Sequence, residues 1–117
     1  MKAMVLRGPG PQLELVERPT PSPGPEQVLI RVRACAVCRT DLHVVDRDLP
    51  DVPTPIIPGH EIVGRVAALG TASKRHEIGD RVGVGWIYSS TGEITENLSE
   101  DFRATGRDAD GGYAGRG

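Results

Sequence analysis

Glycine and proline interrupt this chain so often that only short strands and brief helices fit between them. The 117 residues include 15 glycines and 10 prolines. Proline removes a backbone donor, and glycine weakens the interior of a regular element. Because several of the intervening stretches are apolar or alternate apolar with polar side chains, the sequence predicts a mainly β, barrel-like domain with one or two short helices.

The expected strands follow from these stretches. A hairpin is expected from residues 1–6 and 13–16, joined by a turn at Gly8-Pro9-Gly10-Pro11. The next strands are expected at residues 27–37, 61–69 and 81–86. In the first of these three, alternation places one set of side chains on the buried face: Val28, Ile30, Val32 and Ala34. Gly64 marks a bulge or a close crossing in the second.

A short helix is expected between two of these strands. Thr40 has a side chain suited to an N-cap, and the helix should continue to about Asp46. Leu42 and Val45 are three residues apart, so we expect both to face inward.

Composition and charge exclude several classes of function. With 14 basic and 16 acidic residues the net charge is −2, which argues against a nucleic-acid partner. No apolar run of about 18 residues and no charged-then-apolar leader is present. The sequence therefore predicts a single domain of cytoplasmic location with no membrane span.

Metal-capable side chains gather in two places, in the run from Cys38 to His43 and at His60-Glu61. Zinc binds cysteine sulfur, histidine nitrogen and carboxylate oxygen, and a catalytic zinc has three protein ligands and one open position. Cys38, His60 and Glu61 fit that chemistry. The pair Cys35 and Cys38 also forms C-x-x-C, but a redox dithiol requires a thioredoxin-like context that does not follow here.

Three ordered motifs resemble the zinc-dependent alcohol dehydrogenases of the medium-chain dehydrogenase/reductase family. They are the segments 34–43 (ACAVCRTDLH), 57–66 (IPGHEIVGRV) and 79–83 (GDRVG). The resemblance implies the catalytic domain, with a GroES-like, partly open β-barrel spanning residues 1–117. It also implies bound zinc, with NAD(P) and a small alcohol or aldehyde as reactants of the complete enzyme.

The same resemblance implies a role for each site residue. Cys38 and His60 are expected to ligate zinc, and Asp41 to orient His60 through the ring nitrogen that does not touch the metal. Thr40 and His43 are expected to relay the alcohol proton to solvent. Glu61 is expected near the metal, either outside the ligand shell or replacing a third ligand that the family carries further along its chain.

Two departures from the family alter these expectations. Residues 87–95 are expected to form a short cysteine-free loop where many members carry a lobe that binds a structural zinc, and Ser99 stands at the position of its last cysteine. The glycines at 111, 112, 115 and 117 do not form the G-x-G-x-x-G turn of a Rossmann domain. We therefore expect a trimmed or re-engineered domain that needs a separate nucleotide-binding domain.

Three functions remain open from the sequence. The first is a zinc-binding alcohol dehydrogenase domain with little or no hydride transfer by itself. The second is a zinc-dependent hydrolytic activity. The third is a structural or engineered GroES-like scaffold whose metal site is empty or vestigial.

Overall fold

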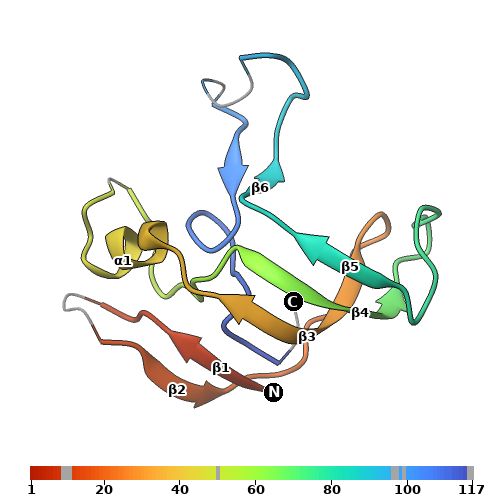
Figure 1. Cartoon of the computed structure of the whole chain (residues 1–117), viewed down its shortest axis with the longest axis horizontal. Helices are drawn as coiled ribbons and strands as arrows, with labels where there is room; N and C mark the ends of the chain where they lie inside the picture. Colours follow the sequence, from red (N-terminus) through yellow and green to blue (C-terminus); the bar gives the residue numbers. More distant parts are fainter. Residues whose placement is uncertain (9–11, 50, 96–97, 99, 116–117) are drawn as a thin grey trace.

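The computed structural model describes residues 1–8, 12–49, 51–95, 98 and 100–115. These residues form a flat body with extents of 39 × 37 × 21 Å. A central sheet crosses it, a small hairpin lies along one side and a second hairpin projects from the other (Figure 1). The prediction of a mainly β chain with one or two short helices is confirmed.

The described residues contain three antiparallel sheets. β1 (Lys2–Val5) pairs with β2 (Glu14–Glu17). β3 (Val28–Ala36), β4 (Glu61–Leu69) and β5 (Arg81–Val84) form the central sheet in that order. β6 (Ile87–Ser89) pairs with β7 (Arg103–Ala104). The first hairpin is confirmed, although residues 9–11 of its predicted turn lie outside the described residues.

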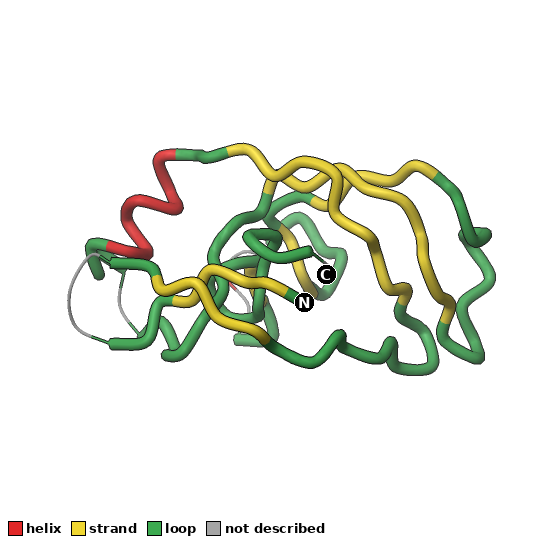
Figure 2. Tube along the Cα trace, turned by 90° about the horizontal axis from the view of Figure 1, so that it is seen from below, coloured by secondary structure: helices red, strands yellow, loops and turns green. Residues whose placement is uncertain are grey.

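Backbone contacts over long sequence distances join the first hairpin to the central sheet. The Met4 amide donates to the Tyr113 carbonyl over 2.8 Å, and the Val32 amide donates to the Gly115 carbonyl over 3.1 Å. Residues 113–115 therefore lie between β1 and β3. Figure 2 shows the first strand and the last described residues close together at the middle of the molecule, so segments far apart in the sequence close one side of the fold.

Irregularities in the β3–β4 pairing change which side chains are buried. The register shifts between Val32 and Ala34, and Ala34 is exposed whereas Cys35 is partly buried. The prediction that Ala34 shares the buried face of Ile30 is therefore wrong, because an inserted residue reverses the alternation. Gly64 lies opposite Val32, where an added Cβ would meet the Arg31 carbonyl oxygen. A close crossing at Gly64 is confirmed.

The helix α1 (Arg39–Val45) begins earlier than expected. Cys38 is the N-cap, and its amide donates to the carboxylate of Asp41 over 3.0 Å. Thr40 is thus inside the first turn, and its predicted N-cap role is wrong because Cys38 occupies the N-cap position, with its amide bonded back to Asp41. The helical structure in the described ranges is too short and too polar to cross a lipid bilayer.

The buried face of α1 also differs from the expected one. Val44 is 1% exposed and packs with Leu6 and Ile56, whereas Leu42 is 52% exposed. The inward pair is Asp41 and Val44, not Leu42 and Val45. The inward residues keep the i, i+3 spacing, but one of them is now the carboxylate of Asp41. Hydrogen bonds from neighbouring segments make the burial of this carboxylate possible.

The segment after β5 corrects two further expectations. The strand predicted for residues 81–86 ends at Val84. The loop predicted for residues 87–95 begins with β6, whose partner β7 lies fourteen or more residues away in the sequence. A three-residue strand without clear alternation carries too little periodicity to be recognised. Ser99 lies outside the described residues.

Candidate metal centre

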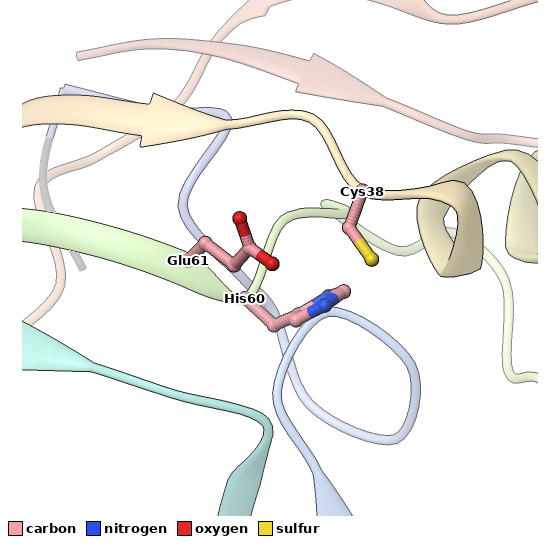
Figure 3. A group of neighbouring side chains, drawn as sticks. All are labelled: Cys38, His60 and Glu61. Carbon is pink, nitrogen blue, oxygen red and sulfur yellow. The ribbon is translucent and has the colours of Figure 1, made fainter.

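Three metal-capable side chains meet where β3 ends and β4 begins. Cys38 stands between β3 and α1, His60 directly precedes β4, and Glu61 is its first residue. Their ligand atoms all lie within 4.8 Å of one another. Figure 3 shows the sulfur, the imidazole and the carboxylate turned toward the same space. The three residues selected from the sequence are thus brought together by the fold.

A backbone turn at Gly59 explains how adjacent residues reach one site. Neighbouring side chains within a strand point to opposite faces, which would separate His60 from Glu61. Gly59 has φ +102°, a left-handed conformation that favours glycine. This turn lies immediately before β4, so His60 is not yet in regular strand geometry. His60 is buried and Glu61 is exposed, yet both ligand atoms reach Cys38.

The donor set suits zinc, with a modest adjustment. Zinc binds sulfur at about 2.3 Å and nitrogen or oxygen at about 2.0–2.2 Å, so tetrahedral ligand atoms lie roughly 3.5 Å apart. The 4.8 Å limit on this group exceeds that spacing by about 1 Å, which side-chain rotation can close. One thiolate, one imidazole and one carboxylate leave a fourth position open, as in catalytic zinc sites.

Asp41 connects the elements that carry the ligands. It is 2% exposed, and its carboxylate accepts hydrogen bonds from the Cys38 amide over 3.0 Å and the Gly59 amide over 3.2 Å. The Tyr113 hydroxyl donates to the same carboxylate over 2.9 Å. A buried carboxylate needs such partners because burial without them is costly. Asp41 therefore holds the backbone beside both Cys38 and His60.

The imidazole of His60 is oriented by two neighbours. Its Nδ1 lies 3.2 Å from Asp41 Oδ1, close enough for an ion pair, but the direction is not that of a hydrogen bond and this buried nitrogen has no other partner. A small rotation of the ring at this distance would align Nδ1 with the Asp41 carboxylate oxygen. Trp86 contacts the ring edge-on, with centroids 4.9 Å apart. This arrangement leaves Nε2 for a metal and matches the carboxylate–histidine pairs that support zinc ligands.

A comparison with known protein families assigns this fold to one of them. Residues 24–116 match the family described as the alcohol dehydrogenase GroES-like domain. The chain belongs to this family. The prediction of a GroES-like fold is thereby confirmed.

Several relatives of this GroES-like domain are alcohol dehydrogenases by name, and others are named L-threonine 3-dehydrogenase. An alcohol dehydrogenase from Rhizobium meliloti (strain 1021) is 46% identical over 121 residues, covering 97% of this chain and 36% of the relative. A cobalt- and zinc-bound thermostable alcohol dehydrogenase from Pyrobaculum aerophilum superposes with a TM-score of 0.89 at 33% identity, covering 100% of this chain and 38% of that one. An NAD-dependent alcohol dehydrogenase gives 0.88 at 30% identity, covering 99% and 36%. The GroES-like domain spans little more than a third of these relatives.

The two predicted relay residues lie beside the site in different ways. Thr40 is half-buried, and its hydroxyl lies 3.8 Å from the Cys38 sulfur. His43 lies one turn further along α1, with 42% of its side chain exposed and its Nδ1 3.0 Å from Asp48. Thr40 thus adjoins the ligand group and His43 reaches solvent.

Cys35 stands apart from the ligand group. Its sulfur packs among Gly59, Gly112 and the ring of Tyr113, where a Cβ on Gly59 would come within 2.8 Å of it. Burial raises the pKa of the Cys35 thiol, and the nearby Asp41 carboxylate adds to the increase. A thiol with a raised pKa is a poor nucleophile and a poor ligand at neutral pH. This agrees with the expectation that Cys38, and not Cys35, serves a metal.

Sequence reasoning missed two residues of the site, Trp86 and Tyr113. Trp86 was expected only to end a strand, yet its ring contacts His60. Tyr113 lies 72 residues after Asp41 and donates to its carboxylate. The available signal was Gly111-Gly112, a pair suited to close backbone approach. Both glycines pack tightly against the His60-bearing segment, Gly111 on the Gly59 carbonyl and Gly112 on Ile62.

Proposed function

We propose that this chain is the zinc-binding catalytic domain of an alcohol dehydrogenase-type oxidoreductase. The observation that carries the proposal is the convergence of Cys38, His60 and Glu61 within 4.8 Å, with Asp41 3.2 Å from the imidazole. The similarity to a cobalt- and zinc-bound alcohol dehydrogenase supports the choice of metal.

The three candidate ligands differ in how firmly the fold holds them. Cys38 is tied to Asp41 through its own amide, and His60 follows Gly59, whose amide is tied to the same carboxylate. These two ligands are therefore preorganised. Glu61 is exposed, so its carboxylate can rotate into the shell or be displaced from it. Bound zinc would supply Lewis-acid polarisation of an alcohol or carbonyl oxygen.

Proton transfer is assigned to the residues of α1. The Thr40 hydroxyl stands beside the Cys38 sulfur, where it can accept a proton from a substrate hydroxyl and pass one on. His43 is partly exposed and held by Asp48, which suits a group that delivers protons to solvent. The proposed sequence of proton carriers is thus the Thr40 hydroxyl beside the Cys38 sulfur, followed by the solvent-facing imidazole of His43.

The proposed substrate is a small alcohol or aldehyde, with NAD(P) as the hydride carrier. A hydride acceptor must be oriented against the substrate, and alcohol dehydrogenases of this type use a nicotinamide held by a separate nucleotide-binding domain. The named relatives are almost three times as long as the matched region, and one is NAD-dependent. These facts support a partner domain of that kind.

The proposal is tested by measuring how much zinc the chain binds after Cys38 and His60 are both replaced. The double variant Cys38→Ser, His60→Ala should lose bound zinc, because water replaces both preorganised donors. Cys35→Ser is the matched control, since it removes a thiol three residues away that the site does not use, and it should keep one zinc per chain. Metal content is measured by atomic emission after dialysis against a fixed free-zinc buffer.

The alternative outcomes separate the remaining functions. Zinc retained by the double variant would remove these residues from the site. A parent chain without zinc under saturating conditions would favour a scaffold with a vestigial site. Glu61→Gln tests the third donor: a lower zinc affinity supports ligation by Glu61, and an unchanged affinity leaves it beside the metal.

A further inference from the structure

Among the described residues near the end of the sequence, Tyr113 reaches the support of the ligand group, because its hydroxyl donates to Asp41. It belongs to the segment 111–115, which runs alongside residues 57–59. The Gly111 amide donates to the Ile57 carbonyl over 2.6 Å, the Gly112 amide to Gly59 over 3.0 Å, and the Tyr113 amide to Pro58 over 3.1 Å. These bonds hold residues 57–59, which directly precede His60, against a segment more than fifty residues later in the sequence.

The side chain of Tyr113 contacts both the hydrophobic core and Asp41. Its ring packs on the core formed by Ala3, Val5 and Ile57, and its hydroxyl donates to Asp41 Oδ2 over 2.9 Å. The other oxygen of that carboxylate accepts from the Gly59 amide and faces His60 Nδ1. Asp41 is therefore held from both sides, and Tyr113 is its only described side-chain hydrogen-bond donor.

The hydroxyl is suited to remain a donor. Burial raises the pKa of Tyr113, and the hydrogen bond to Asp41 raises it further. Without this donor, Asp41 would keep its backbone partners but one buried oxygen would lose half of its hydrogen bonding, and the carboxylate could rotate away from His60. Because groups behind a metal ligand set its orientation and basicity, such a change should reach the metal.

We propose that Tyr113 is a positioning residue of the metal site, acting through Asp41 on His60 and Cys38. This inference rests on the proposed zinc site, and it adds a residue that acts on the ligands through Asp41. It also implies that metal binding and the docking of residues 111–115 on residues 57–59 stabilise each other, since whatever holds Asp41 in place favours both.

The direct test removes only the hydroxyl. Tyr113→Phe keeps the ring on the core and should lower zinc affinity roughly tenfold in a competition titration with a chromophoric chelator. Tyr88→Phe is the matched control: the same atom is removed from an exposed tyrosine whose hydroxyl contacts only Gln27 among the described hydrogen bonds, and affinity should not change. Substituted cobalt should show an altered visible spectrum in Tyr113→Phe and an unaltered one in Tyr88→Phe.

A double variant tests whether the effect passes through Asp41. In the Asp41→Asn background, Tyr113→Phe should cost much less than tenfold, because the carboxylate on which the hydroxyl acts is gone. A purely structural role would lower the stability of the metal-free chain while leaving zinc affinity and the cobalt spectrum as in the parent, and that result would overturn the inference.

The parent chain provides a test that needs no variant. Zinc should slow amide hydrogen exchange at Gly112 and Tyr113, while the Ser73 amide, bonded to Gly70 in a distant turn, should exchange at the same rate. Unchanged exchange at Gly112 and Tyr113 in zinc-saturated protein would overturn the coupling. A parent that binds no zinc would overturn the proposed function itself, so the two failures are distinguishable.

Discussion

The central part of the chain and the hairpin that projects from it contrast in how their side chains are held. The site region, residues 28–69, contains buried Ile30, Val44, Ile62 and Val66 and the buried polar residues Asp41 and His60. In the hairpin arm, residues 87–104, every described residue from 87 to 101 is exposed, including Ile94 at 100%. Figure 1 shows this arm extending away from the central sheet.

Two hydrogen bonds from backbone amides anchor the arm near its base. The Thr105 amide donates to the Trp86 carbonyl and the Ala104 amide donates to the Asp108 carboxylate, each over 2.8 Å. A two-stranded hairpin without a packed face is marginally stable. The contrast teaches that the candidate metal ligands lie where burial and hydrogen bonding fix the backbone. The ring contact with His60 comes from Trp86, the residue directly before the arm.

The largest expected effect comes from filling the close crossing in the site region. Gly64→Val should destabilise the domain by about 3 kcal/mol, because the new side chain meets the Arg31 carbonyl and the Ile30 side chain. Gly85→Val is the matched control, since a Cβ there meets nothing within 4 Å. Urea unfolding followed by circular dichroism measures both. An equal loss of stability in the two variants would mean that β3 and β4 move apart to admit the new side chain, and it would contradict a tightly packed site region.

A pair of aliphatic truncations compares the two regions directly. Val44→Ala should cost about 2 kcal/mol, because Val44 is 1% exposed within a packed cluster. Ile94→Ala removes a larger group from a fully exposed position and should change stability by less than about 0.5 kcal/mol. The midpoints of thermal unfolding report the difference. An Ile94→Ala cost as large as that of Val44→Ala would show that the arm is packed in solution.

The smallest expected effect distinguishes the two thiols of the site region. At pH 8, Cys35 should react with iodoacetamide roughly tenfold more slowly than Cys38, because burial raises its pKa and lowers its thiolate fraction. Raising the pH should narrow the gap, since more of the Cys35 thiol then ionises. Peptide mass spectrometry gives both rates, and labelling in urea, where they should converge, is the control. Faster labelling of Cys35 would contradict the assigned roles.

Two errors of the sequence-based predictions, the buried face of α1 and the burial of Ala34, share one cause. The strand 61–69 was predicted to the residue, because it combines a long apolar run with clear boundaries. The buried face of α1 was wrong because Asp41 replaced an apolar residue on it, and Ala34 was wrong because a register shift reversed the alternation of β3. In each case a contact between distant segments outweighed a local pattern.

By itself the sequence determined the short-strand architecture and the identities of the three candidate ligands, because glycine and proline spacing and donor chemistry are local properties. Only the tertiary structure decided how the adjacent His60 and Glu61 both reach Cys38, that Asp41 collects the Cys38 and Gly59 amides, and that Tyr113 donates to the same carboxylate. The physical reason is that a buried carboxylate must collect its hydrogen bonds from whichever segments surround it. Here those segments lie up to 72 residues apart, a distance that no local pattern records.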